Sequence, residues 1–325
     1  MNVLVTGAGG FLGQEVVARL LDRGHWVRAM VRANASNLPW ADKVDLVRAD
    51  LRVVADFGPL LDNIDIIVHL ASATSGNEDV QFASTVVGTE RLVSAMAKSK
   101  VRKLVLASSF VVYDWAQAKG TMDERTPLLA KPYDMGGYTI AKVWQERVVR
   151  RAAQLHDWDL RVVRPGFIWG PSHTNIAGMG RRVGPFHLAF APFAQLPLTH
   201  VMNCADCIVA VTESPAAAGE TFNIVDSNKI RIWRYAREYS RRSGERRLVI
   251  PVPYYLGLLV AKMAAFVSRL LFGENGKLPS LLTPRRYEAQ FKPIRYSTEK
   301  LRRALNWTSP LSFKECLAKS YRAED

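Results

Sequence analysis

Three glycines near the N-terminus restrict the possible folds more than any other feature of this sequence. Gly7, Gly10 and Gly13 follow an apolar run at residues 3–5 and precede residues 14–22, which have helical periodicity. A strand, a glycine turn and a helix in this order present the N–H groups of the first helical turn to a pyrophosphate. Gly7 allows the tight turn, Gly10 lets the backbone approach a phosphate, and Gly13 lets helix and strand pack closely. We therefore predict a dinucleotide-binding unit.

Further strands alternate with helices, which predicts a doubly wound parallel Rossmann sheet of the α/β class with a smaller, mainly helical C-terminal substrate lobe. The further predicted strands cover residues 24–32, 44–49, 64–70, 103–107 and 160–163. We assign residues 1–171 and about 200–228 to the dinucleotide-binding domain, and residues 172–199 and 229–325 to the substrate-binding lobe. Ligands of such sheets bind beyond the carboxyl ends of the strands. A helix beginning near residue 200 is predicted to have Asn203 as its N-cap.

The end of the second predicted strand bears on the choice of dinucleotide. NAD-binding units place an acidic residue there for the ribose hydroxyls, whereas this chain has Arg32. A guanidinium is a planar, permanently charged donor that suits a 2′-phosphate, so NADP is favoured over NAD. Ser36 could add a hydroxyl, and Asp50 at the end of the third strand could accept from the adenine amine. The alternative is a solvated arginine at a strand end.

Polar residues after the fifth strand and on the following helix suggest acid–base chemistry. Ser109 follows the strand, and Tyr138 and Lys142 lie one helical turn apart. A phenol has a pKa of about 10, and a nearby ammonium favours the phenolate. A serine hydroxyl can orient the oxygen of a carbinol or carbonyl. Tyrosine and lysine occur at this spacing on many helices by chance, so the combination with the glycine turn carries the prediction.

Composition limits the partners and the compartment. The net charge is +14 and the pI about 9.9, which fits a polyanion, an anionic membrane surface or a phosphorylated small molecule. The basic residues form no arm with interleaved aromatics, so we expect no nucleic-acid binding. Cys204, Cys207 and Cys316 provide no disulfide framework, and we predict small buried thiols, no metal site and a reducing cytoplasm. His69 lies within an apolar run and is predicted to be a core histidine.

Residues 251–273 are apolar around a full helix, interrupted by Lys262. A membrane-spanning helix needs roughly 20 apolar residues with few charges, so this segment is borderline. It could be a buried helix of the lobe, a helix in a membrane interface held by basic flanks, or a span. The interface alternative makes the protein cytoplasmic and peripheral to the membrane.

These motifs together resemble those of the extended short-chain dehydrogenase/reductase family, also called the NAD-dependent epimerase/dehydratase family. The resemblance rests on residues 6–13, Asp50-Leu51, His69-Leu70-Ala71, Ser109 with Val112-Tyr113, Tyr138 with Lys142, and Arg164-Pro165. It implies that Ser109, Tyr138 and Lys142 are the catalytic triad. The cofactor contacts that it implies are Gly7, Gly10, Phe11, Leu12, Gly13, Asp50, Leu51, Leu70, Ala71, Tyr138, Lys142 and Pro165. One departure is Thr85, where many members have an asparagine.

The resemblance implies an enzyme that transfers a hydride at a secondary carbinol or carbonyl carbon, with NADP or NAD as cofactor. Nucleotide sugars are the most common substrates of similar proteins, and the arginines that could bind a diphosphate are Arg181, Arg182, Arg231, Arg285 and Arg286. Two alternatives stay open: a membrane-associated sterol or lipid hydroxyl dehydrogenase, because the segment from Tyr254 resembles the membrane-facing part of 3β-hydroxysteroid dehydrogenase relatives, and a non-catalytic NADP-sensing protein. We expect a homodimer.

Overall fold

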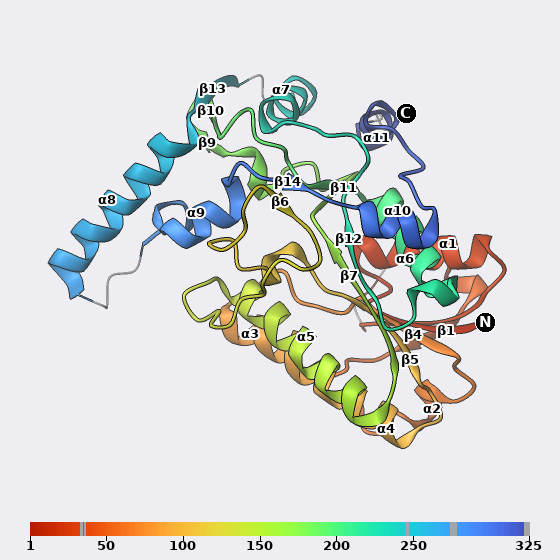
Figure 1. Cartoon of the computed structure of the whole chain (residues 1–325). Coiled ribbons are helices and arrows are strands. Elements are labelled where there is room, and N and C mark those ends of the chain that lie inside the picture. Colours follow the sequence, from red (N-terminus) through yellow and green to blue (C-terminus); the bar gives the residue numbers. More distant parts are fainter. Residues whose placement is uncertain (33–34, 36, 245–246, 274–277, 322–325) are drawn as a thin grey trace.

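A parallel seven-stranded sheet forms the centre of the molecule (Figure 1). The computed structural model describes residues 1–32, 35, 37–244, 247–273 and 278–321. Across the sheet the strands are β12 (Thr221–Ile224), β7 (Asp159–Pro165), β5 (Lys103–Ala107), β4 (Ile66–His69), β1 (Asn2–Thr6), β2 (Trp26–Val31) and β3 (Asp45–Arg48). The chain therefore starts in the middle of the sheet and reverses its strand order beside β1. This confirms the predicted Rossmann-type α/β fold.

Helices cover both faces of this sheet. α3, α4 and α5 lie together on one face, and α1 and α6 pack against each other on the other (Figure 1). The α-helices are α1 (Phe11–Asp22), α2 (Gly58–Leu61), α3 (Glu78–Phe82), α4 (Gly88–Lys98), α5 (Gly137–His156), α6 (Val201–Glu213), α7 (Ile232–Arg242), α8 (Tyr254–Phe272), α9 (Pro284–Phe291), α10 (Glu299–Leu305) and α11 (Phe313–Ser320). A π-helical segment, Ala83–Val87, joins α3 to α4.

The alternation of side chains along β1 builds two separate cores. Val3 and Val5 point to the layer of α1 and α6, where they join the same buried cluster as Val16. Leu4 points to the opposite face and joins a cluster that includes Met96 of α4. Both clusters are fully buried, because a parallel sheet with helices on both faces leaves neither face to solvent.

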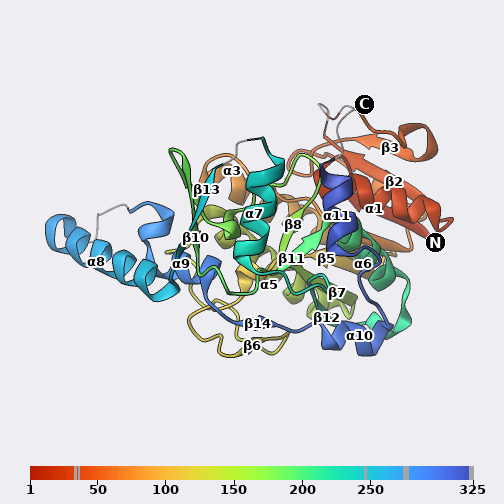
Figure 2. The same cartoon turned by 90° about the horizontal axis from the view of Figure 1, so that it is seen from above.

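Smaller sheets and the helices α7, α8, α9 and α11 form a second lobe beyond the carboxyl ends of the strands (Figure 2), whereas α2 and α10 pack into the cores of the sheet domain. In the described part of the chain this lobe contains the sheet of β13 (Leu248–Val252), β10 (Phe186–Phe190) and β9 (Arg181–Val183). Two strand pairs connect the lobes, β8 (Phe167–Trp169) with β11 (Leu198–His200) and β6 (Thr121–Met122) with β14 (Arg295–Tyr296). Trp169, Tyr235 and Tyr287 are among the largest buried side chains of the lobe.

The predicted N-cap of α6 is wrong. His200 is the N-cap, and its ring accepts from the backbone of Met202. Asn203 lies inside the helix, where its amide donates to Asp226 and to the carbonyl of Leu311, each at 3.0 Å. Asn203, which the sequence predicted to cap the helix, therefore anchors the C-terminal segment to the sheet domain.

The apolar helix α8 projects from the second lobe (Figures 1 and 2). Only Tyr254, Leu258 and Ala261 are buried, and these lie on the face toward α9. The exposed apolar side chains are Tyr255, Leu256, Leu259, Val260, Met263, Phe266, Val267, Leu270, Leu271 and Phe272. The alternative of a buried lobe helix therefore does not hold for most of its length. Within the described ranges, this is the one helix with the length and composition to cross a membrane.

Gly13→Ala is expected to destabilise the protein by roughly 3 kcal/mol or more, because overpacking against rigid backbone forces the chain apart. A Cβ atom at Gly13 would lie 2.1 Å from the carbonyl oxygen of Gly7. Urea unfolding of the cofactor-free protein measures the effect. Gly136→Ala is the matched control, since its added Cβ would have no atom within 4 Å. Equal stability of the two variants would show that α1 does not approach β1 this closely.

Candidate active site

The carboxyl ends of β1 and β4 form an open cradle at the start of α1. Gly7 has φ +72°, and a Cβ there would lie 2.8 Å from the backbone nitrogen of Ala71. α1 begins at Phe11 with Gly10 as its N-cap, no side-chain cap and no acidic residue in its first turn. Its first N–H groups therefore have no side-chain acceptor from the cap, as a pyrophosphate site requires. The residues present fit the phosphates of a dinucleotide.

The other residues predicted to contact a cofactor lie around this cradle. Leu70 and Ala71 directly follow β4, Leu51 is buried beyond the end of β3, and Pro165 is the buried last residue of β7. Sequence reasoning missed a partner of Phe11 from the second lobe. The ring of His173 stacks on that of Phe11, with centroids 4.0 Å apart and planes at 19°. This contact joins the glycine turn to the loop that follows β8.

A cluster of charges lies beyond β2 and β3. Arg32 is exposed, and its charge contributes to lowering the pKa of Asp50. The hydrogen bond from Arg52 is the largest cause of that lowering, with a nitrogen–oxygen distance of 2.6 Å. Arg52 was not singled out from the sequence. Its guanidinium is paired with the Asp50 carboxylate that was expected to accept from the adenine amine. Arg28 on β2 pairs with Asp45 of β3 at 2.6 Å, and Ser36 lies outside the described residues.

The structure brings Ser109, Tyr138 and Lys142 to the same edge of the sheet. Ser109 follows β5, and Tyr138 and Lys142 lie in the first turns of α5. Burial raises the pKa of Tyr138, while a hydrogen bond with Ser109 acts in the opposite direction. Burial lowers the pKa of Lys142 to about 7, opposed by the charge of Glu146. The site thus contains a phenol in contact with a hydroxyl, with an easily deprotonated amine one turn further along the helix.

The Lys142 ammonium makes one hydrogen bond to β5 and one within α5. Its Nζ donates to the carbonyl of Ala107 at 2.8 Å and to the side-chain oxygen of Gln145 at 2.9 Å. The amide nitrogen of Gln145 in turn donates to the carbonyl of Ala71 at 3.1 Å and to Thr89 at 3.0 Å. Gln145, which the motif comparison missed, therefore connects Lys142 to the loop after β4.

A buried ion pair fixes α5 against the sheet. Glu146 accepts hydrogen bonds from Arg164 of β7 and from the Ser108 hydroxyl, the latter at 2.5 Å. Burial alone would raise the pKa of Glu146, but the hydrogen bond and charge of Arg164 outweigh it and lower the pKa to about 2. Arg164 also donates to the Tyr113 hydroxyl at 3.0 Å. The adjacent serines thus differ, with Ser108 held by the ion pair and Ser109 next to Tyr138.

The residues predicted to be structural are buried as expected. His69 contacts Thr6 at 2.6 Å and Thr89 at 2.8 Å, and burial lowers its pKa to about 3, helped by the charge of Lys142. Cys204 and Cys207 are fully buried in α6. Thr85, the departure from the family pattern, is buried, and its hydroxyl accepts a hydrogen bond from the backbone of Ala73 at 3.0 Å.

Comparison with known proteins identifies the family. A model of the NAD dependent epimerase/dehydratase family matches residues 3–225, which include the glycine turn, Ser109, Tyr138 and Lys142. The chain belongs to this family. It is an enzyme of the extended short-chain dehydrogenase/reductase type, and its dinucleotide is NAD or NADP.

Relatives of this enzyme differ in how much of the chain they match. The 3 beta-hydroxysteroid dehydrogenase/Delta 5→4-isomerase of Mycobacterium tuberculosis is 30% identical over 97% of this chain and 89% of its own. The UDP-glucose 4-epimerase of Mycolicibacterium smegmatis is 37% identical over 53% of this chain and 57% of its own. The UDP-glucuronic acid 4-epimerase of Bacillus cereus, solved in complex with NAD, shares the fold: its TM-score is 0.72 at 18% identity, over 99% and 97% of the two chains.

Replacing Lys142 by methionine is expected to change stability in a pH-dependent way. The ammonium has a pKa of about 7 in the folded protein and about 10.5 in the unfolded chain. The folded state therefore bears the full cost of the buried charge below pH 7, and this cost declines as the pH rises toward 10.5. The free energy of unfolding of Lys142→Met relative to wild type should be highest near pH 6 and fall with increasing pH. Urea titrations at several pH values measure it.

The exposed Lys131 provides the control for this comparison. The difference in free energy of unfolding between Lys131→Met and wild type should not show this dependence on pH. A difference for Lys142→Met that stays constant between pH 6 and pH 10 would contradict the lowered pKa.

Proposed function

We propose that this enzyme is a dehydrogenase or reductase that acts on a secondary alcohol or the corresponding ketone of a lipid-soluble substrate at a membrane surface. The observation that carries this proposal is the exposed apolar surface of α8, which belongs to the same lobe as the predicted substrate site. The chemistry is assigned to Ser109, Tyr138 and Lys142.

Each of these three residues has a distinct task in the proposed reaction. When bound, the nicotinamide supplies or accepts the hydride. In the oxidative direction the Tyr138 phenolate takes the hydroxyl proton of the carbinol as its C–H hydride departs, and in reduction the phenol returns that proton. Ser109 donates a hydrogen bond that orients the reacting oxygen. The charge of Lys142 favours the phenolate and so offsets part of the cost of ionising a buried tyrosine.

We assign NADP as the preferred dinucleotide. The support for this assignment is that the charges of both Arg52 and Arg32 act on Asp50, near the strand ends where a 2′-phosphate would lie. A guanidinium binds a phosphate through parallel charge-assisted hydrogen bonds. Asp50 is held by Arg52 and contributes little net negative charge against that phosphate. Gly7, Gly10 and Gly13 would contact the pyrophosphate, and Lys142 the nicotinamide ribose.

Membrane contact follows from the cost of leaving α8 in water. A large apolar side chain gains about 1.5–3 kcal/mol when it is removed from water, and ten such side chains are exposed on this helix. Lys262 and Arg269 on the same helix are exposed and can reach the headgroup region of a bilayer. We infer that α8 lies in the membrane interface, with the protein peripheral to the membrane. The match to the steroid dehydrogenase, which extends through this segment, supports this assignment.

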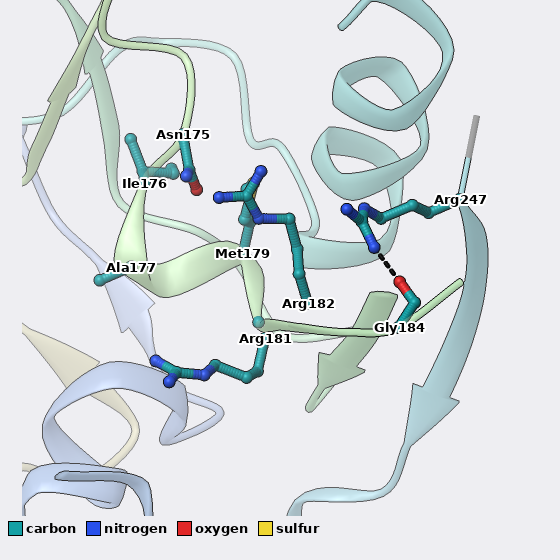
Figure 3. A pocket seen from close by; sticks show the side chains of 9 residues that line it. Asn175, Ile176, Ala177, Met179, Arg181, Arg182, Gly184 and Arg247 are labelled. Carbon is teal, nitrogen blue, oxygen red and sulfur yellow. Dashed lines mark hydrogen bonds between the residues drawn. The ribbon is translucent and has the colours of Figure 1, made fainter. Parts of the chain in front are cut away.

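A nucleotide sugar is the second candidate substrate. It is supported by the relative that is a UDP-glucose 4-epimerase and by an arginine-lined cavity in the second lobe (Figure 3). Arg181 and Arg182 line that cavity, as expected for a diphosphate site. Arg285 instead pairs with Asp134 at 2.6 Å. The expected homodimer remains a prediction.

Tyr138→Phe should lower turnover to the background rate while leaving NADP affinity within about twofold of wild type, because only the acid–base group is removed. Hydride transfer to NADP with a soluble cyclic secondary alcohol measures turnover, and fluorescence titration measures affinity. Tyr133→Phe is the control, since Tyr133 is mostly exposed. Retained turnover in Tyr138→Phe would remove the proposed acid–base residue.

The membrane assignment is tested by flotation of the protein with neutral phosphatidylcholine vesicles. Wild type should float, and the double variant Phe266→Asp, Leu270→Asp should lose at least about 100-fold in partitioning, because two exposed apolar side chains that would enter the bilayer are replaced by charges. Leu155→Asp is the matched control, because Leu155 is 75% exposed on α5 and Leu270 is 74% exposed on α8. Wild-type protein that stays with the aqueous fraction would contradict the proposed membrane contact.

A further inference from the structure

Gln145 is a buried glutamine three residues beyond Lys142 on α5, and its side-chain amide contacts two kinds of partner. Its Oε1 lies 2.9 Å from the Nζ of Lys142. Its Nε2 lies 3.1 Å from the carbonyl oxygen of Ala71 and 3.0 Å from the hydroxyl of Thr89 in α4. The amide therefore connects the amine of α5 to two neighbouring parts of the chain.

The partners of Gln145 fix the direction in which its amide points. A backbone carbonyl can only accept a hydrogen bond, so the atom beside Ala71 must be the amide nitrogen. An ammonium can only donate, so the atom beside Lys142 must be the amide oxygen. The Thr89 hydroxyl donates its own proton to the carbonyl of Thr85 at 2.6 Å and therefore accepts from Gln145. All three contacts agree on one orientation, which presents an acceptor to Lys142.

His69 completes this network behind Gln145. Because the proton of Thr89 goes elsewhere, the 2.8 Å contact between these two side chains is donated by Nε2 of the imidazole. The Nδ1 of a neutral imidazole then accepts, and the Thr6 hydroxyl donates to it at 2.6 Å. Burial, helped by the charge of Lys142, lowers the pKa of His69 to about 3, so the ring is neutral at pH 7. Each group of the network thus has one role as donor or acceptor.

Two of the three N–H bonds of the Lys142 ammonium are directed at acceptors of this kind. One is donated to the carbonyl of Ala107 at 2.8 Å and one to Gln145. Among the described residues the ammonium makes no other hydrogen bond, so its third N–H can serve a ligand. Because the bonds of an ammonium are tetrahedral, the two fixed N–H groups decide the direction of the third.

The charged and titratable groups around Lys142 leave its charge poorly compensated. Glu146 is on the same helix, but its carboxylate accepts hydrogen bonds from Arg164 of β7. Tyr138, one turn back on α5, has a pKa raised by burial and is a neutral phenol at pH 7. His69, at the end of β4, is neutral as well. The direct partners of the ammonium are therefore a carbonyl and an amide, which carry no net charge.

We propose that Gln145 is a positioning residue that holds Lys142 for the cofactor and sets whether its amine is charged at neutral pH. The amide oxygen stabilises the ammonium through one hydrogen bond but adds no negative charge, so the charged and neutral forms of the amine stay close in free energy. An acidic side chain in this place would keep the amine charged, and an apolar one would leave it neutral. This inference rests on the proposed function, in which the charge of Lys142 favours the Tyr138 phenolate.

Two substitutions of Gln145 should move the pKa of Lys142 in opposite directions. Gln145→Met keeps the length of the side chain but removes the acceptor, which should lower the pKa from about 7 to about 6 or below. Gln145→Glu places a carboxylate beside the ammonium and should raise the pKa to about 8 or above. An NMR titration of cofactor-free protein labelled with 13C-lysine measures this pKa, and the signal is assigned by its loss in Lys142→Met.

Gln154→Met is the matched control, because Gln154 is an exposed glutamine on the same helix. It should leave the pKa of Lys142 unchanged. A measurement on wild type needs no variant and stays decisive if a substitution at Gln145 impairs folding. In protein labelled with 15N at the glutamine side chains, the slowly exchanging amide of Gln145 should titrate with the same midpoint as Lys142, because its oxygen accepts from that amine.

Two results would overturn the inference. One is a pKa of Lys142 that is the same in wild type, Gln145→Met and Gln145→Glu. The other is a shift of the same sign in both variants, which would indicate a general disturbance of packing. Failure of the proposed function is recognised separately, since the titrations use neither cofactor nor substrate, whereas retained turnover in Tyr138→Phe would remove the catalytic assignment and leave the measured link between Gln145 and Lys142 intact.

Discussion

The geometry of the candidate site depends on the buried ion pair between Glu146 and Arg164. It joins the middle of α5 to β7, and the Ser108 hydroxyl joins β5 to the same carboxylate. Removing one partner of such a pair typically costs 3–5 kcal/mol, because the other charge stays buried without compensation. Tyr138 and Lys142 lie on the same helix as Glu146, and Ser109 is adjacent to Ser108. The ion pair therefore fixes the distance between the hydroxyl that orients a substrate and the phenol that exchanges its proton.

The site combines this rigid pair with an amine that is held in an unfavourable environment. Lys142 is buried, its pKa is lowered to about 7, and its hydrogen bonds go to neutral groups, the carbonyl of Ala107 and the amide of Gln145. The opposite charge of Glu146 only partly offsets the burial. Burying the ammonium in this way does not stabilise the fold. Ionisable groups with strongly shifted pKa values are typical of active sites, where their charge takes part in the chemistry. Gln145 extends the network to Ala71, so the amine and the loop after β4 share one set of hydrogen bonds.

The second lobe carries both clustered charges and exposed apolar side chains. Its arginines gather at one cavity, while large apolar side chains remain exposed on α8 and along the sheet of β9, β10 and β13.

Local spacing in the sequence determined the glycine turn, the Rossmann sheet and the positions of Tyr138 and Lys142, because these features depend on residues within a few turns or strands of one another. Two departures from expectation involve contacts between distant segments: the ring of His173 stacks on Phe11, and Asn203 binds the C-terminal segment instead of capping α6. The pairing of Arg52 with Asp50 is local, but it depends on the turn that the backbone makes after β3. The exposure of α8 was likewise decided by the tertiary structure alone. The apolar composition of α8 does not reveal how many of its faces are covered by other elements. In the structure, α9 and the short turn before it cover one side of the first half of α8, and the rest is exposed.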